Sequence, residues 1–424
     1  MRHRFGVLTL VLGSLWAMAV SAQQPLHHIT SDTCQLCHKE VFKQWQGSMH
    51  AQSTALKDPI HATFYGIVAG SPNEEGVTMK ASGKYPLCLN CHAPNAAMDK
   101  KTKLDANPAY AEGVNCIACH TLQSYNGIKK PDGKLQLGIH AYDISTSQLQ
   151  GPGVHSNRGL ERLIAAADPF GGSGLGDSAK PNPHLGEPVE MDGVQVPALP
   201  MMANPTQLKS NDACMGCHDM RPNANGVPLC QTGDEYIASG SQVDCIACHM
   251  PINNGVADHS MGGGHDSAML RRSVLFTVEG KREGDTIATT VTLTNQQPHN
   301  LPTGAPFRNI HLKLTAYDDQ GSVVWQNAEG HPAKSDPKAY LLYSLVDDEG
   351  KPASPTVATK VGSDNRLKPF EERKLNYTIP AAGVALVRGE LYYSLLWPGL
   401  VKKFTHLDKE LTDPKLIASS ELQL

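Results

Sequence analysis

Four features are scarce or absent in this sequence of 424 residues, and each narrows what the protein can be. Apolar residues make up only 40%, a low share for a chain long enough for two or three domains. After residue 22 no apolar run is long enough to cross a bilayer. Positive charge is not in excess, because 37 Lys and Arg face 41 Asp and Glu, so nucleic acid is a disfavoured partner. Cysteine is absent after Cys248, which confines cysteine chemistry to the first part of the chain.

Ten of the eleven cysteines lie in five C-x-x-C-H motifs. The paired cysteines are Cys34 and Cys37, Cys88 and Cys91, Cys116 and Cys119, Cys214 and Cys217, and Cys245 and Cys248, and the histidines that follow them are His38, His92, His120, His218 and His249. Two sulfurs three residues apart emerge on one side of a helical turn, where they can form thioethers to both vinyl groups of one porphyrin, and the next histidine can bind the iron. A zinc site needs four ligands, but it does not require a histidine directly after the second cysteine of each pair, so the repeated histidine favours haem over zinc. The sequence therefore predicts five covalently attached haems c.

The motifs are dense and partly repeated. All five fall within residues 23–270, about 50 residues per haem, which is too little chain to wrap each porphyrin separately. Residues 86–125 and 212–255 resemble two copies of one two-haem unit, with motif separations of 28 and 31 residues. The alternative is that C-I-A-C-H recurs only because it suits haem attachment. Either way, we expect haems that lie close together and supply much of the apolar interior.

A six-coordinate haem needs a second axial ligand beyond its motif histidine. The predicted second ligands are His50, His155, His259, His265 and His299. The alternative ligands are His61, His140, His184, Met201 and Met202. A helix over residues 39–55 is expected to carry His50 near its end. His299 lies in a loop that Pro298, Pro302 and Gly304 stiffen, so it is predicted to cap a haem from the C-terminal region.

Residues 1–22 have the pattern of a secretory signal peptide, with Arg2 and Arg4 before an apolar stretch and Val20-Ser21-Ala22 before the expected cut. An uncleaved anchor is the alternative. Cleavage would change the net charge from -4 to -6, and ten haem propionates would add to it. We therefore expect a periplasmic or secreted protein that does not span a membrane, and redox partners with basic faces.

The two parts of the mature chain have different patterns. Residues 126–211 are rich in Gly, Pro, Asn and Asp and are expected to form a long loop with one helix near residues 160–167. From Arg271 onward, β-branched residues alternate with polar ones, as at residues 286–293. The predicted organisation is a signal peptide (1–22), a pentahaem domain of helices and irregular chain (23–270), and an all-β, immunoglobulin-like sandwich (271–424).

Several of these motifs together resemble the cytochrome c554 family, which is related to hydroxylamine oxidoreductase. The resemblance covers about residues 30–270 and rests on the first motif with Trp45, Ser48, His50 and Ala51, on Gly151-Pro152 with His155, on the last motif with Met250-Pro251, and on His259 with Gly263-Gly264-His265. Residues 299–304 resemble an element found where such proteins carry a C-terminal β domain. The family implies mostly bis-histidine haems in close pairs and a role in electron transfer. This chain departs from it with five motifs instead of four, so ligand pairing cannot be transferred.

Three functions fit these residues. The first is electron transfer through closely packed haems. The second is a multihaem oxidoreductase that acts on a small nitrogen or sulfur compound at one open, five-coordinate iron. The third is a scaffold whose β domain docks a partner or mediates self-association. The eleventh cysteine, Cys230, is interpreted as a buried residue, with a distal ligand or nucleophile as the alternative. No motif carries Lys in place of His, and we favour electron transfer over catalysis.

Overall fold

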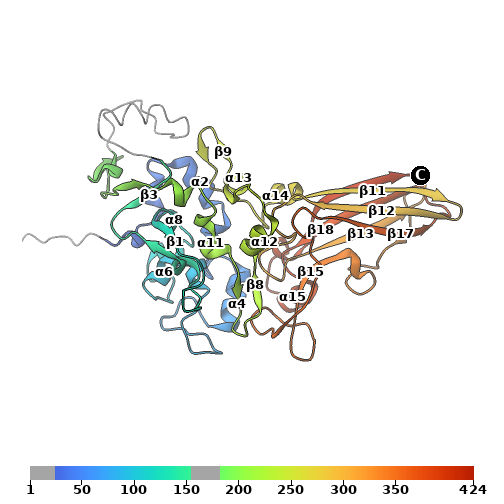
Figure 1. The fold of residues 1–424 in the computed structure, drawn as a ribbon, viewed down its shortest axis with the longest axis horizontal. Coiled ribbons are helices and arrows are strands. Elements are labelled where there is room, and N and C mark those ends of the chain that lie inside the picture. The colour runs from blue at the N-terminus through green and yellow to red at the C-terminus, as the bar shows by residue number, and fades with distance from the viewer. Residues whose placement is uncertain (1–23, 154–181) are drawn as a thin grey trace, which may run out of the picture.

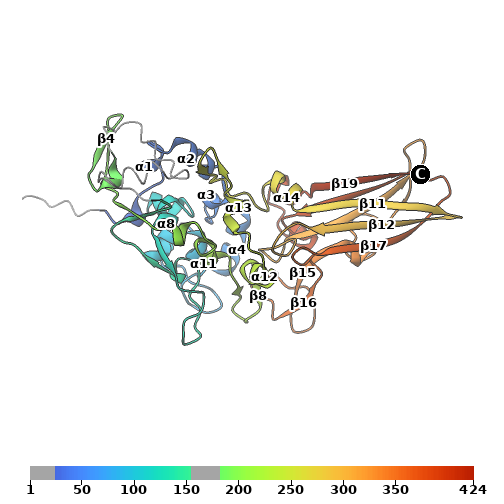
Figure 2. The same cartoon turned by 45° about the horizontal axis from the view of Figure 1, so that its top comes forward.

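The computed structural model describes residues 24–153 and 182–424. The expected signal peptide, the helix near residues 160–167 and the predicted ligand His155 lie outside the described residues. Figures 1 and 2 show a first part of short helices and loops beside a second part of long strands. None of the helices in the described ranges is both long and apolar enough to span a membrane.

The first part is built from short helices. They are α1 (Asp32–Gln35), α2 (Lys39–Gln46), α3 (Met49–Gln52), α4 (Pro59–Val68), α5 (Leu89–His92), α6 (Pro94–Met98), α7 (Pro108–Ala111), α8 (Cys116–His120), α10 (Pro205–Leu208), α11 (Asp212–His218), α12 (Thr232–Ser239), α13 (Cys245–His249) and α14 (Ser267–Arg272), with 3-10 turns η1 (Leu26–His28), η2 (Gly138–Ala141) and η3 (Pro183–Leu185). The single helix expected over residues 39–55 is wrong. It is interrupted at Gly47, and Ser48 starts α3 by accepting a hydrogen bond from the Ala51 amide at 3.3 Å.

Small sheets lie between these helices, partly within the segment that was expected to be a loop. The antiparallel pairs are β1 (Leu122–Tyr125) with β2 (Tyr142–Ile144), β4 (Val189–Met191) with β5 (Val194–Val196), β7 (Arg221–Pro222) with β8 (Pro228–Cys230), and β9 (Ile252–Asn253) with β10 (Val256–Ala257). A parallel pair joins β3 (Leu149–Gly151) to β6 (Met201–Ala203). Composition alone therefore underestimated the order of this segment, because each pair is only two to four residues long.

The second part begins at Val274 and consists mainly of antiparallel strands. A three-stranded sheet has the order β11 (Val274–Glu283), β12 (Thr286–Asn295), β17 (Glu372–Pro380). A six-stranded sheet has the order β16 (Lys360–Asp364), β15 (Tyr340–Val346), β13 (Asn309–Tyr317), β18 (Leu386–Ser394), β19 (Lys415–Gln423), and β14 (Val323–Gln326) also pairs with β13. The short helices η4 (Pro337–Ala339), α15 (Pro398–Lys403) and α16 (Lys409–Thr412) lie in the connections.

Both sheets bury side chains in one apolar cluster. Along β12 every second residue is buried, including Ile287, Val291 and Leu293, which is the alternation that places one face of a strand in a core. Leu314 of β13 and Val387 of β18 belong to the same cluster from the other sheet. The two sheets therefore pack face to face around a shared core.

The two parts are packed against each other. Ile60 of α4 belongs to the apolar cluster of the strands, and the ring of Phe64 stacks on Phe307 at a centroid distance of 5.1 Å. The Tyr343 hydroxyl of β15 donates a hydrogen bond of 3.0 Å to the Pro228 carbonyl of β8. The strand-containing part therefore has a defined position beside the motifs.

Candidate cofactor sites

The five motifs form a connected set. The thiols of Cys34 and Cys116 are in hydrogen-bonding contact, as are those of Cys91 and Cys217 and those of Cys214 and Cys245. Cys119 lies near enough to Cys214 and Cys217 to raise the pKa of both thiols electrostatically, after the larger effects of hydrogen bonding and burial. The fourth motif therefore lies next to the second, third and fifth, and the first motif lies next to the third.

The motif histidines are oriented by backbone carbonyls. Nδ1 of His92 donates to Ser53 O at 3.0 Å, Nδ1 of His120 to Gln150 O at 2.8 Å, and Nδ1 of His249 to Gly262 O at 2.7 Å. With the proton held on Nδ1, the Nε2 lone pair is available to a metal. Burial also lowers the pKa of His120 and His218 to about 4, which keeps both imidazoles in the neutral form that binds metal.

The same arrangement occurs at histidines outside the motifs. Nδ1 of His184 donates to Leu199 O at 3.0 Å, Nδ1 of His259 to Ala257 O at 2.7 Å, and Nδ1 of His299 to Asn300 O at 3.0 Å. His50 differs, because its Nδ1 contacts the sulfur of Met261 at 2.8 Å. In each case Nε2 is the nitrogen left to bind a metal.

Three of these rings face a motif histidine at a common separation. The ring centroids are 6.1 Å apart for His38 and His184, 6.1 Å for His50 and His218, and 6.4 Å for His249 and His299. Metal–imidazole bonds of about 2 Å on both sides of one iron would place the two ring centres roughly 6 Å apart. The donor sets therefore fit an iron held between two imidazoles.

The other two motifs have different surroundings. His259 lies close enough to His120 to lower its pKa further, after the larger effect of burial. The His61 ring is only 4.1 Å from the His92 ring, and Nδ1 of both rings donates to the same Ser53 carbonyl. Two rings this close, held from one side, do not have the separation of the other three pairs.

The remaining predicted ligands are placed elsewhere. His265 lies beside Arg308 and Lys415, which lower its pKa to about 4 together with the larger effect of burial. His140 is exposed, and Met202 is 44% exposed. Met201 packs against the same apolar cluster as Leu36, which lies within the first motif. Met261 was missed by the sequence analysis, although it lies in the Gly-rich segment between His259 and His265.

A second feature that the sequence analysis missed is a buried ion pair beneath the His299 loop. Glu235 of α12 accepts a bond of 2.6 Å from Nη1 of Arg366, and both side chains are only 6% exposed. Its other carboxylate oxygen accepts from the Asn300 amide at 3.2 Å and from the Thr303 hydroxyl. Glu235 therefore fixes the loop that carries His299 to the first part of the chain, as a positioning residue.

Cys230 lies beside Arg221 and near Cys91. Burial raises the pKa of its thiol, and the positive charges of Arg221 and Arg308 offset part of this increase. Cys230 pairs with Arg221 across β8 and β7. Burial thus favours the protonated thiol at neutral pH.

Comparisons with known proteins agree with this site. Residues 33–121 match the family described as "Cytochrome c554 and c-prime". A penta-heme cytochrome c552 from Thermochromatium tepidum is 60% identical, with 95% of this chain and 100% of that chain covered and a TM-score of 0.88. A DUF1425 family member from Shewanella sp. pv-4 is 16% identical over 28% of this chain and 73% of that chain, with a TM-score of 0.15, which carries no argument. No curated protein matches.

The motifs and these comparisons define a multihaem c-type cytochrome, as predicted. The chain belongs to the family of the penta-haem cytochromes c552, and it carries five covalently bound haems c. The fifth motif, which departs from the four-motif pattern of cytochrome c554, is therefore a property shared with a close relative.

Proposed function

We propose that this protein is an exported electron-transfer cytochrome in which most haems have two histidine ligands. Haem c supplies one-electron redox chemistry when it is bound. The observation that carries the proposal is the proximity of the motifs: Cys34 contacts Cys116, Cys217 contacts Cys91, and Cys214 contacts Cys245. Cys119 lies close enough to Cys214 and Cys217 to act on both thiols electrostatically, which places the third motif beside the fourth. Haems attached at these thiols would lie close together, with the fourth at a branch point.

Three proposed axial pairs follow from the ring geometry: His38 with His184, His218 with His50, and His249 with His299. A fourth pair, His120 with His259, is proposed because the two imidazoles lie close enough to interact electrostatically. The carbonyls that hold Nδ1 of five of these histidines (His120, His184, His249, His259 and His299) fix the ring orientation and increase the basicity of Nε2. The chain thus holds the irons in a fixed environment, which reduces the reorganisation that accompanies each change of charge.

The His299 pair gives the most direct test. His299→Ala should retain five haems by mass spectrometry, while one haem becomes high-spin and binds carbon monoxide. His140→Ala, at an exposed position, is the matched control and should leave the spectrum unchanged. An unaltered low-spin spectrum in His299→Ala would contradict the axial role.

A second function, reduction or oxidation of a small nitrogen or sulfur compound, is favoured by the geometry at His92. The His61 ring, tilted by 38° at a centroid distance of 4.1 Å, is too close to bind the same iron from the opposite face, which supports an open position at this haem. The half-buried Arg221 lowers the pKa of His92 after the larger effects of burial and His61, so its cationic group lies nearby. An anion at this haem would find a positive charge within reach.

Cyanide or nitric oxide titration distinguishes the two functions. If one iron is open, the wild-type protein should bind one equivalent per five haems with a change in one low-field signal. If His155 is instead the sixth ligand, wild type should bind none and His155→Ala should bind one. The second result would restrict the protein to electron transfer.

Export and partner choice are proposed on the basis of the sequence. N-terminal sequencing of mature protein should begin at Gln23, and the protein should appear in the periplasmic or extracellular fraction. An uncleaved anchor would leave the protein in the membrane fraction.

A redox partner with a basic face should exchange electrons with this protein at a rate that falls steeply with ionic strength, because salt screens the attraction to an acidic cytochrome.

For the second part of the chain we infer an immunoglobulin-like sandwich that docks a partner or a second copy. Strands β11, β12 and β17 take the order of strands A, B and E, and β13, β18 and β19 that of C, F and G. Light scattering over a concentration series tests self-association. A constant monomer mass would leave partner docking as the role of this part.

A further inference from the structure

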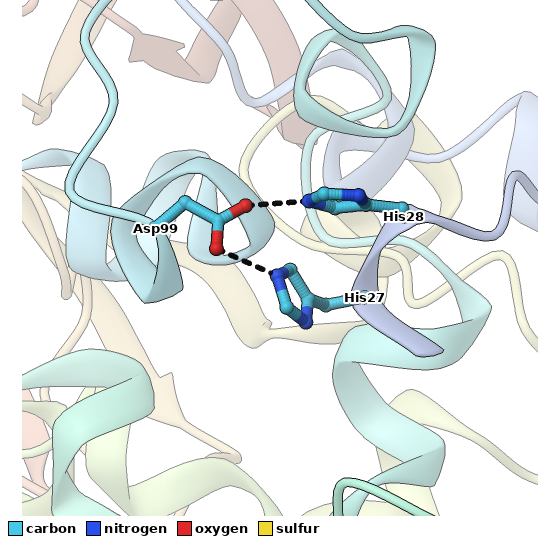
Figure 3. Close-up of side chains that lie close together, drawn as sticks. All are labelled: His27, His28 and Asp99. Carbon is cyan, nitrogen blue, oxygen red and sulfur yellow. Dashed lines mark hydrogen bonds and ion pairs between the residues drawn. The ribbon is translucent and has the colours of Figure 1, made fainter. Parts of the chain in front are cut away.

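Three side chains that lie outside the haem motifs come together at one place in the first part of the chain. His27 and His28 of η1 both direct Nε2 at the carboxylate of Asp99, which follows α6 (Figure 3). The distances are 2.9 Å from His27 to Oδ1 and 2.5 Å from His28 to Oδ2. All three ligand atoms lie within 4.8 Å of one another, and this group is the one such three-ligand set among residues 24–153 and 182–424.

The donor set has the composition of a zinc-type site. Two imidazole nitrogens and one carboxylate oxygen suit a borderline cation such as Zn²⁺, whereas Ca²⁺ and Mg²⁺ prefer oxygen ligands only. Tetrahedral bonds of about 2 Å put neighbouring ligand atoms roughly 3.3 Å apart. The two observed distances between a histidine nitrogen and a carboxylate oxygen would each need to increase by less than about 1 Å, which side-chain rotation can supply.

The carboxylate is prepared for this role by its neighbours. The Tyr110 hydroxyl of α7 donates to Oδ2 of Asp99 and lies 3.2 Å from Nε2 of His28. Burial alone would raise the pKa of Asp99, but the hydrogen bonds from Tyr110, His28 and His27 lower this pKa to about 2. A ligating carboxylate oriented by an outer hydrogen bond is a recurring feature of metal sites.

The site is also accessible. The side chains of His27, His28 and Asp99 are 15%, 25% and 29% exposed, which leaves an entry path and room for a water as fourth ligand. A metal here would join the first described turn of the chain to α6. The following residues already contact the segment just before the third haem motif: Glu112 accepts from the Ser31 amide at 3.0 Å, and Asn115, the residue before Cys116, donates to Ile29 O at 3.3 Å.

We propose that His27, His28 and Asp99 bind one divalent, zinc-like cation that fastens the N-terminal segment to the haem-bearing part. Binding exchanges the two Nε2–H···O hydrogen bonds for metal bonds, and each neutral imidazole keeps its proton by carrying it on Nδ1. The metal gains three protein ligands and one water, and no oxidation or reduction is involved. Tyr110 is a positioning residue for the carboxylate.

The test uses the holoprotein, freed of zinc by chelation and then dialysed to equilibrium against micromolar zinc. Elemental analysis should find one zinc per five irons, the irons serving as an internal count of chains. His27→Gln/His28→Gln should weaken binding by more than about 100-fold, and Tyr110→Phe by about 10-fold. His140→Gln removes an exposed histidine elsewhere and should retain full binding.

Zinc should also raise the melting temperature of wild type and His140→Gln, but not of the double variant, because a ligand that binds only the folded state stabilises it. If the double variant has altered haem spectra, Asp99→Asn serves in its place, since it removes the anionic ligand while keeping the side-chain size. Absence of bound zinc in wild type, or equal binding by wild type and the ligand variants, would overturn the proposal.

Discussion

The helices of the first part are four to ten residues long, whereas strands β11 and β12 of the second part each run for ten residues. The apolar side chains of the two parts differ in the same way. In the described residues, most of those of the second part belong to one large cluster that both sheets share, and a small cluster joins Tyr343 and Leu345 to Val227 and Leu229 of the first part. Those of the first part are otherwise mainly divided among three smaller clusters. The second part is therefore stabilised by its own core, and the first depends on the haems to fill its interior.

The largest effect should come from removing the haems. A full-length chain produced without haem attachment should lose the order of its first part and retain the strands, because the largest continuous core of the described residues lies in the second part. Limited proteolysis should then cut before residue 267 and leave a resistant fragment starting near Val274. Equal digestion of both parts, or equal resistance in the haem-free chain, would contradict this comparison.

A substitution in the core of the second part should destabilise the strands and leave the haem-bearing first part unchanged. Leu314→Ala removes a fully buried side chain between the sheets and should lower the free energy of unfolding by about 2–5 kcal/mol. The haem absorption spectrum at room temperature should not change. Val323→Ala, at a position 56% exposed, is the control and should cost much less. Thermal unfolding followed by circular dichroism measures both.

The junction between the parts is sensitive to Glu235. Glu235→Ala leaves Arg366 buried with Asp364 as its one remaining ionic partner among the residues that the structure describes, and it frees the loop of His299. We expect a loss of about 3 kcal/mol, the lower end of the range for a broken buried pair. One haem should also become partly high-spin, which a purely structural pair would not cause.

Two variants sharpen this result. Glu235→Gln keeps an acceptor for Asn300 and Thr303 and should restore most of the low-spin signal. Glu371→Ala breaks the more exposed pair with Arg373 and should leave every haem unchanged. If Glu235→Ala shows a fully low-spin spectrum, Glu235 does not position His299.

The parts also differ in how far the sequence predicts them. The motif spacing predicts the haems because thioether chemistry requires adjacent residues, and the alternation along residues 286–293 predicts strand β12 because burial on one face requires a period of two. The contact of His299 with His249 could be anticipated only as a hypothesis, since 50 residues separate them. Glu235 and Arg366 could not be predicted at all, because a pair 131 residues apart leaves no local pattern.

His184 illustrates a further limit of the sequence. It was an alternative ligand, yet its ring faces His38, while the preferred His265 lies beside Arg308 and Lys415. The sequence supplies more histidines outside the motifs than five haems need, and the selection among them depends on which rings the loops place opposite a motif histidine. One such loop brings Leu199 O to Nδ1 of His184.

The smallest expected effect is the loss of stability at low pH, which can be compared at one carboxylate from each part, Asp99 and Asp364. Hydrogen bonds from Tyr110, His28 and His27 outweigh burial and lower the pKa of Asp99 from 3.8 to about 2, and Arg366 does the same for Asp364. A carboxylate with a lowered folded-state pKa contributes stability that is complete above about pH 4 and is lost as the pH falls towards 2. Because Asp99 is partly exposed, we expect its contribution to the free energy of unfolding to be about 1 kcal/mol.

Hydrogen exchange of residues 24–31 should therefore accelerate between pH 4 and pH 2 beyond the intrinsic rate, while β16 responds to Asp364 instead. Asp99→Asn should abolish the acceleration in the first segment alone. If exchange there has the same pH profile in wild type and Asp99→Asn, the carboxylate does not hold the N-terminal turn.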